Sequence, residues 1–188
     1  MSTASENRPA TYADVEALPP KMVGQIINGV LHAHPRPVPK HARASSTLGV
    51  ELGGPFDRGK GGPGGWIILD EPELHLDDHV LVPDLAGWRR ERLPKLPETA
   101  YFALAPDWVC EVLSPSTARI DRIEKLEIYA EQRVGHVWLI DPDAQTLEVF
   151  ELAGSKWQIA ATFAGDVDVA APPFAVHTWS LAALWADV

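Results

Sequence analysis

Two carboxylates stand where the surrounding sequence is apolar. Glu111 lies inside the run WVCEVL at residues 108–113, and Asp84 follows the apolar run Val80–Val82. An unpaired carboxylate in a buried strand costs several kcal/mol or shifts its pKa, so a cation, a shared proton or a metal must compensate it. Carboxylates on neighbouring strands lie about 5 Å apart at Cβ, which suits a divalent ion with oxygen ligands at about 2.0–2.4 Å. The pair therefore favours one divalent ion, with a salt bridge or a strand end that reaches solvent as the alternative.

A lysine follows these acids on a predicted helix. Lys125 lies four residues after Asp121. Taken alone, this spacing favours an exposed i,i+4 ion pair worth a few tenths of a kcal/mol. A role beside Glu111 is the alternative.

Hydrophobic periodicity predicts the elements that must position these side chains. We expect a hairpin over 25–32 that turns at Asn28-Gly29, strands over 66–69, 79–88, 108–113, 136–140, 146–152 and 157–163, and helices over 11–18, 40–52, 118–133 and 180–185. The helix over 118–133 would bury Ile120, Ile123, Leu126 and Ala130. This order predicts an α/β or α+β fold with a mixed sheet. We expect one domain over 1–188, with a mobile N-terminus (1–10) and a mobile glycine-rich loop (53–65).

Composition sets limits on the class of protein. The chain has 188 residues, 46% of them hydrophobic, and 16 basic against 26 acidic residues give a net charge of −10. Such an acidic chain is a poor candidate for a non-specific nucleic-acid coat, because counterion release needs many basic residues on one face. The single cysteine, Cys110, excludes a disulfide framework and a CxxC zinc site. Without a signal-like or membrane-spanning apolar run, we expect no membrane association and a cytoplasmic location.

Three stretches of the sequence resemble the Uma-type restriction endonuclease family, within the PD-(D/E)XK nuclease superfamily. They are PDLAGW from residue 83, WVCEVLSPST from residue 108 and DRIEKLEIYAEQRVGHVWLIDP from residue 121. The family pattern is approximately PD, then EVLSPST, then D-x-x-x-K-x-x-x-Y-A, then G-V-x-x-Y-W-L-V-D-P. The resemblance covers about residues 10–180. It implies a restriction-endonuclease-like αβββαβ core, with a mixed central sheet flanked by helices and extra hairpin strands.

The resemblance also implies a reaction and its residues. Asp84 matches the PD aspartate and Glu111 the (D/E)XK carboxylate. The superfamily lysine would normally stand at residue 113, which is leucine here, and Lys125 takes its place from the following helix. Asp84, Glu111 and the Val112 backbone carbonyl would hold Mg²⁺ or Mn²⁺, with Glu71 as a further ligand or supporting acid. The implied activity is metal-dependent endonucleolytic hydrolysis of phosphodiester bonds.

The implied partner is nucleic acid, with DNA as the expected substrate. Arg89 and Arg90, after Asp84, and Arg119 and Arg122, on the Lys125 helix, are candidates for phosphate contacts. A solvated charged surface is the alternative for each arginine. We also expect a homodimer, with some of the seven tryptophans as a possible dimer face. The competing function is a non-catalytic homodimeric scaffold or nucleic-acid-binding module that retains the fold.

Several other residues stay open at this point. The family commonly has an acid before the NGVL-like hairpin, where this chain has Gln25. His41 stands where the family often has histidine, and it either faces the site or serves the helix start. Cys110 should point to the opposite side of its strand from Glu111 and act as a small buried hydrophobe. The remaining histidines show no strong zinc signature.

Overall fold

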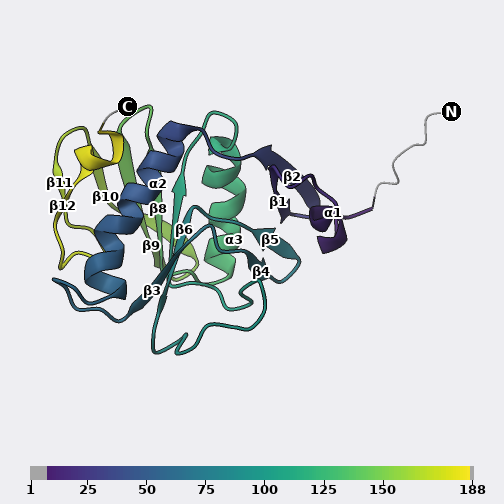
Figure 1. The fold of residues 1–188 in the computed structure, drawn as a ribbon, viewed down its shortest axis with the longest axis horizontal. Coiled ribbons are helices and arrows are strands. Elements are labelled where there is room, and N and C mark those ends of the chain that lie inside the picture. Colours follow the sequence, from purple (N-terminus) through teal and green to yellow (C-terminus); the bar gives the residue numbers. More distant parts are fainter. Residues whose placement is uncertain (1–7, 187–188) are drawn as a thin grey trace.

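A six-stranded mixed sheet forms the centre of the computed structural model, which describes residues 8–186. Its strand order is β10-β9-β8-β7-β6-β3. The strands are β3 (Trp66–Asp70), β6 (Leu85–Arg89), β7 (Trp108–Val112), β8 (His136–Asp141), β9 (Thr146–Ala153) and β10 (Lys156–Ala164). β7 and β8 run parallel, whereas every other neighbouring pair is antiparallel. Figure 1 shows helices α2 and α3 on opposite sides of this sheet.

The αβββαβ order of the expected core is present along the chain. Helix α2 (Pro39–Leu52) is followed by β3, β6 and β7, then by the helix formed by η2 (Ile120–Lys125) and α3 (Leu126–Glu131), and finally by β8. A parallel partner for β7 requires a crossover, and this second helix supplies it. The predicted α+β class with a mixed sheet is therefore confirmed.

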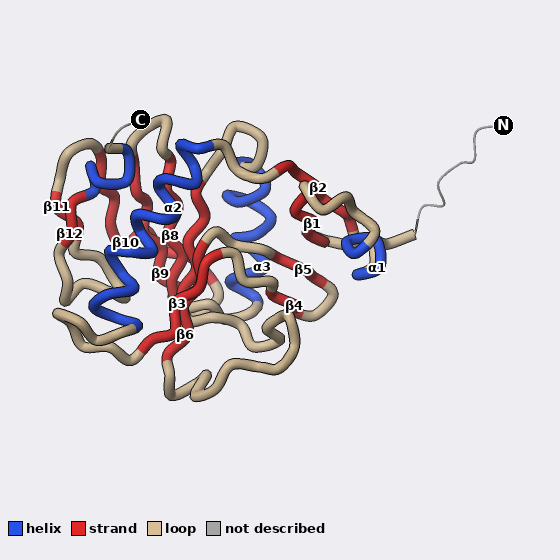
Figure 2. Tube along the Cα trace, viewed as in Figure 1, coloured by secondary structure: helices blue, strands red, loops and turns tan. Residues whose placement is uncertain are grey.

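A smaller four-stranded sheet lies beside this core, as Figure 2 shows. Its order is β2-β1-β5-β4, with strands β1 (Met22–Ile27), β2 (Val30–Pro35), β4 (Leu74–Leu76) and β5 (His79–Leu81). The short helix α1 (Tyr12–Glu16) contacts β1. Asn28 and Gly29 turn the β1–β2 hairpin with φ angles of 51° and 74°, as a tight two-residue hairpin turn requires. The predicted hairpin is thus confirmed.

Both faces of the large sheet carry an apolar core. On one face α2 packs through Ala44, Leu48 and Leu52, the stripe that the sequence predicts. On the other face Ile128 and Tyr129 of α3 pack against the sheet. Cys110 is fully buried in the first core, so its predicted role as a buried hydrophobe is confirmed. Burial raises the pKa of its thiol well above the ordinary value, which keeps it protonated.

The remaining elements extend this framework at its C-terminal end. A two-stranded sheet pairs β11 (Asp168–Val169) with β12 (Trp179–Ser180), and the 3₁₀-helix η3 (Leu181–Trp185) contacts α2. Six of the seven tryptophans considered for a dimer face are buried in the protein, and Trp157 is partly buried. Among the described residues, no helix is long and apolar enough to cross a membrane.

Three sequence-based expectations differ from the structure. The segment 79–88 is two strands in two different sheets, because Pro83 cannot donate a ladder hydrogen bond and the chain turns there. The first part of the expected glycine-rich loop is the π-helix η1 (Gly53–Asp57), which continues α2 and buries Phe56. Residues 1–7 of the expected mobile N-terminus lie outside the described residues.

The third difference concerns the helix that carries Lys125. Ile123, expected on its buried face, is 56% exposed, whereas Asp121 and Lys125 are 3% exposed. The helix begins as the π-helix η2 before it becomes α3, and the wider i→i+5 turn shifts the side-chain pattern away from the 3.6-residue period. The buried face is therefore polar in the first turn and apolar only further along.

Candidate active site

Asp84 lies where the chain passes from the small sheet to the large one. β5 ends at Leu81 and β6 begins at Leu85, so Asp84 occupies the turn between them. Its Oδ2 accepts a 2.7 Å hydrogen bond from the Val112 backbone N–H, and its Oδ1 lies 3.3 Å from Nε2 of His41. The carboxylate is thus fixed against the end of β7 by one bond and against the start of α2 by the other.

Glu111 meets Lys125 in the interior of the protein. The ammonium of Lys125 lies 3.0 Å from Oε2 of Glu111 and 3.1 Å from Oδ1 of Asp121. The Tyr129 hydroxyl donates a 2.6 Å hydrogen bond to Oε1 of Glu111. Asp121, Lys125 and Tyr129 follow one another at intervals of four along the helix, and β7 places Glu111 opposite them. The exposed ion pair that the spacing of Asp121 and Lys125 favours is wrong, because both side chains are buried.

The charges of this group explain its pKa shifts. Burial raises the pKa of Glu111 to about 8, with Lys125 opposing the shift and the charges of Asp121 and Asp84 adding to it. Burial works against the charged form of Lys125, but the two carboxylates it contacts raise its pKa above the ordinary lysine value. Lys125 is therefore a fixed ammonium, suited to stabilising negative charge rather than to removing a proton.

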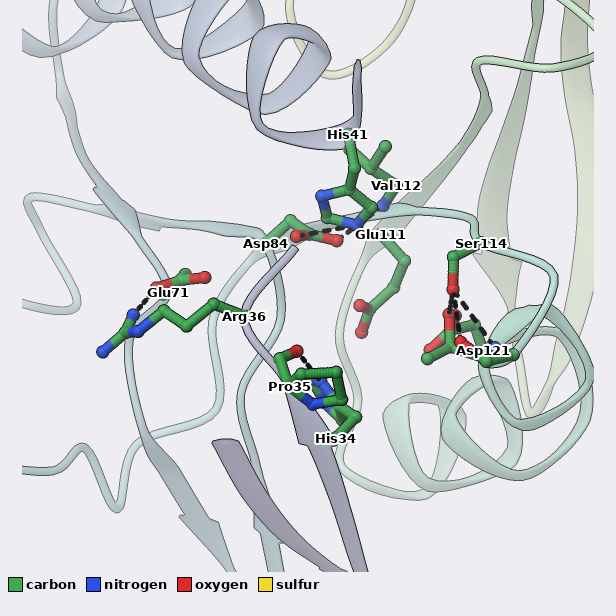
Figure 3. A network of polar contacts seen from close by, with 12 residues as sticks. His34, Pro35, Arg36, His41, Glu71, Asp84, Glu111, Val112, Ser114 and Asp121 are labelled. Carbon is green, nitrogen blue, oxygen red and sulfur yellow. Dashed lines mark hydrogen bonds and ion pairs between the residues drawn. The ribbon is translucent and has the colours of Figure 1, made fainter. Parts of the chain in front are cut away.

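Asp84 and Glu111 open into a common pocket of about 150 Å³, which we call the acidic pocket. Its floor is formed by the ends of β7 and of the Lys125 helix, and its opposite wall by the β1–β2 hairpin and the proline-rich segment that follows. The lining includes Gln25, His34, Arg36, His41, Glu71, Asp84, Glu111, Val112, Ser114, Asp121 and Lys125. Figure 3 shows His41, Asp84 and Val112 together, with the Glu111 carboxylate pointing into the middle of the group.

Hydrogen bonds fix the side chains of Gln25 and His34 in the hairpin wall of the pocket. The side chain of Gln25, 4% exposed, accepts a 3.0 Å hydrogen bond from the Val82 N–H with its Oε1. This orientation turns its amide nitrogen to His34 Nε2 at 3.2 Å, and His34 Nδ1 lies 3.2 Å from the Pro35 carbonyl. Since the amide nitrogen can only donate, His34 accepts with Nε2 and donates with Nδ1. Gln25 and His34 thus brace the hairpin at the pocket.

Glu71 reaches the pocket in a different way from the one expected. It follows β3 directly, and its backbone N–H donates to the Asp84 carbonyl at 3.0 Å. Its carboxylate, however, lies 3.2 Å from the Arg36 guanidinium, as Figure 3 shows. Glu71 therefore borders the acidic pocket while its charge is paired with Arg36.

The four predicted phosphate-binding arginines lie outside the lining of the acidic pocket among the described residues. Arg89 ends β6, five residues after Asp84, or roughly 17 Å away at about 3.3 Å per strand residue. Its guanidinium stacks over the Trp66 ring, and Arg90 pairs with Asp57. Arg119 and Arg122 are on the Lys125 helix and form ion pairs with Glu124 and Glu148. The exposed cation that lines the pocket is Arg36.

The chemistry of the donor set fits a divalent cation. Asp84, Glu111 and Asp121 bring three carboxyl groups to the pocket beside the ammonium of Lys125, and Glu111 must lose its proton to act as a ligand. Carboxylate and backbone oxygens are the ligands that Mg²⁺ and Mn²⁺ prefer. In the described part of the chain, no three His, Cys, Asp or Glu side chains are grouped closely enough to hold a metal as they stand. A cation here would therefore draw on Asp84, Glu111, the Val112 backbone and water.

Sequence reasoning missed several residues that the structure brings to this site. Asp121 and Tyr129 were visible as members of the family's D-x-x-x-K-x-x-x-Y-A pattern, but their roles depend on the π-turn. Gln25 and His41 were noticed without an assigned partner. Arg36 gave no signal, because a proline-rich segment reads as a loop and nothing local shows that it folds over a pocket.

The fold and this acid–acid–lysine grouping define a protein of the nuclease-like class with a restriction-endonuclease-like core. A family model described as "Putative restriction endonuclease" (Uma2) matches residues 10–184. The chain therefore belongs to the Uma2 family of putative restriction endonucleases. It is also similar to the crystal structure of a putative nuclease belonging to DUF820 from Anabaena variabilis, with a TM-score of 0.71 and 25% sequence identity over 95% of this chain and 98% of that one. No match among curated proteins was found.

Proposed function

We propose that this protein is a metal-dependent endonuclease that hydrolyses phosphodiester bonds in DNA. The observation that carries the proposal is the convergence of Asp84, Glu111 and Lys125 on one pocket from a turn, a strand and a helix. Asp84, Glu111 and the Val112 backbone carbonyl would hold Mg²⁺ or Mn²⁺, which would supply Lewis-acid polarisation of a phosphoryl oxygen. Membership of a nuclease family supports the same reaction class.

The side chains divide the remaining tasks. Lys125 stays charged between two carboxylates and faces the negative charge that develops on the phosphoryl group. Asp121 and Glu111 fix the direction of that ammonium, and Tyr129 fixes Glu111. Since Lys125 is held as an ammonium, the proton of the attacking water leaves to another acceptor or to solvent.

Nicking of supercoiled plasmid by purified protein in Mg²⁺, Mn²⁺ or EDTA tests this function. We expect Asp84→Asn and Glu111→Gln to reduce the metal-dependent rate by at least about 100-fold, the scale for losing one electrostatic partner of a transition state. The matched control is Glu131→Gln, an exposed acid on α3, which should nick like the wild type. Equal nicking by Asp84→Asn and the wild type would contradict the proposal.

The same assay distinguishes the competing scaffold function. A protein that binds DNA in gel shift but leaves it intact in every metal would fit a non-catalytic module. An assay with single-stranded RNA of the same sequence tests the choice of DNA. A homodimer in the cytoplasm stays part of this proposal, and sedimentation velocity at several concentrations tests the dimer.

A further inference from the structure

One ion pair joins the two walls of the acidic pocket at its edge. Arg36 belongs to the proline-rich segment that follows β2, and Glu71 follows β3 of the large sheet. Nη1 of Arg36 lies 3.2 Å from Oε2 of Glu71, to one side of Asp84 in Figure 3. The two side chains are 66% and 38% exposed, whereas that of Glu111 is 3% exposed. This pair, which we call the rim pair, therefore lies on the solvent side of the pocket, where an entering ligand can reach it.

The rim pair is weaker than the contact that a phosphate can make with the same guanidinium. A single hydrogen bond from Nη1 forms it, and its 3.2 Å length exceeds the approximately 2.7–2.9 Å of a strong charge-assisted bond. Exposed ion pairs contribute little, because water screens them and two long side chains must be immobilised. Two oxygens of a phosphate can instead accept parallel hydrogen bonds from the guanidinium. Arg36 is thus able to exchange one anionic partner for another.

The backbone of Glu71 keeps its carboxylate beside the pocket. Its φ angle is +46°, in the left-handed region that residues other than glycine adopt rarely. Such a conformation persists only where the surroundings fix it. Here the Glu71 N–H donates to the Asp84 carbonyl at 3.0 Å. Glu71 is therefore anchored to the backbone that carries one of the candidate metal ligands.

Prolines restrict the backbone of Arg36 on the opposite side of the rim. They stand at positions 35, 37 and 39, and each holds φ near about −65°. Val38, between the last two, has the polyproline II angles φ −69° and ψ 157°. With the backbone restricted, the long side chain of Arg36 is the part that can turn away from Glu71.

We infer that Glu71 takes the place of a substrate phosphate on Arg36 in the free protein, and that nucleic acid displaces it. This inference rests on the proposed nuclease function. Lys125 is held in buried ion pairs, so Arg36 is the exposed cation through which the pocket lining meets a backbone phosphate. In the complex the guanidinium binds that phosphate, and the released Glu71 carboxylate turns to solvent. Arg36 is thus a substrate-binding residue, and Glu71 is an autoinhibitory competitor for it.

Binding of a fluorescently labelled DNA duplex to the full-length protein in EDTA tests the inference. Glu71→Gln should tighten binding by about threefold or more, the scale of one exposed ion pair, because Arg36 no longer has to leave a partner. Asp70→Asn is the matched control, since it removes the same formal charge one residue earlier, from an exposed position outside the pocket lining. It should change binding much less than Glu71→Gln.

A second measurement reports the partner of Arg36 directly. In nitrogen-15 NMR spectra of the arginine side chains, the Nε–H signal that disappears in Arg36→Lys belongs to Arg36. This signal should differ between the free wild type and free Glu71→Gln, because only the wild type has the rim pair. The two signals should coincide once both proteins are saturated with the duplex, because a phosphate then holds the guanidinium in both.

Each outcome bears on the inference separately from the proposed function. Equal tightening by Glu71→Gln and Asp70→Asn overturns it, because the loss of one negative charge then explains the effect. Different Arg36 signals in the two saturated complexes also overturn it, since Glu71 would still hold the guanidinium. An absence of duplex binding by both the wild type and Glu71→Gln overturns it as well. Displacement of Glu71 in a protein that cuts no DNA supports the inference and contradicts only the nuclease proposal.

Discussion

At the scale of single residues, the site depends on one ammonium held by two buried carboxylates. Lys125 lies about 3 Å from both Glu111 and Asp121, and all three side chains are nearly inaccessible to solvent. A buried pair contributes little net stability compared with apolar residues, but removing one partner leaves an uncompensated charge. Lys125 is therefore needed for the fold as well as for the proposed chemistry.

Removing the ammonium should destabilise the protein strongly. We expect Lys125→Met to lower the free energy of unfolding by about 3–5 kcal/mol, measured by urea titration in EDTA at a pH above the Glu111 pKa of about 8, where Glu111 is charged in the wild type. Adding Glu111→Gln to this variant should recover part of the loss, since one buried charge then disappears. A double variant that is no more stable than Lys125→Met would show that Glu111 is not the group left uncompensated.

The raised pKa of Glu111 predicts a pH dependence of stability for the metal-free protein. Because its pKa rises from 4.5 when unfolded to about 8 when folded, the folded protein binds this proton more tightly. The resulting stability is complete below about pH 4.5 and is lost as pH rises through about 8. Thermal unfolding in EDTA between pH 5 and 8 should show this decline in the wild type and a flatter profile in Glu111→Gln. Parallel profiles would contradict the assignment.

The sequence identified the acids for a physical reason that is local. A charged residue inside WVCEVL is unusual whatever the fold, so Glu111 could be recognised from its neighbours. Lys125 could not be assigned from the residues alone, because its spacing to Asp121 is the same in an exposed pair and in a buried one. Only the family pattern pointed to it, and the structure supplied its burial.

At the scale of elements, the predicted strands and helices were those with strong periodicity. The β1–β2 hairpin, α2 and the strands of the large sheet were all foreseeable from turn residues and apolar runs. The division of 79–88 into two sheets was not, because both halves are apolar and only the pairing partners differ. The π-turn of η2 was missed because periodicity analysis assumes 3.6 residues per turn.

The β1–β2 turn should be sensitive to a side chain at Gly29. With φ at +74°, Gly29→Ala forces a left-handed backbone on alanine and should cost about 1 kcal/mol or more. Gly53→Ala is the control, since Gly53 has a helical φ of −64° and nothing within 4 Å of an added Cβ. It should be neutral or stabilising by about 0.4–1 kcal/mol. Equal losses in urea unfolding would refute the conformational explanation.

At the scale of the whole molecule, the acidic net charge and the acidic pocket both repel nucleic acid, although nucleic acid is the proposed substrate. The chain carries −10 overall and its pocket is acidic, so phosphate contacts must come from cations at the rim. Arg36 stands at the pocket, whereas Arg89 and Arg90 lie at the other end of β6. This arrangement could not be foreseen, because nothing local shows that Arg36, which follows β2, lies at the pocket while Arg89 and Arg90 lie at the end of β6 away from Asp84.

Salt dependence of DNA binding should separate the two ends. Losing one phosphate contact lowers the slope of log K against log salt by about 1. We expect this change for Arg36→Ala and not for Arg90→Ala, measured by fluorescence anisotropy with a labelled duplex in EDTA. A lowered slope in Arg90→Ala alone would place the nucleic acid at the far end of the sheet and restore the original expectation for that arginine.

The acidic pocket is built from two independent pieces of the fold. Asp84, Glu111 and Lys125 all belong to the large sheet, its crossover helix or the turn that enters it, whereas Gln25 and His34 face them from the small sheet. The proposed catalytic residues and the residues of the opposite pocket wall therefore come from separate stretches of the sequence. Exchanging residues 22–38 between homologous proteins would change the residues that border the pocket while leaving the proposed catalytic residues Asp84, Glu111 and Lys125 in place, which makes this hairpin the natural place to redirect the proposed specificity by grafting.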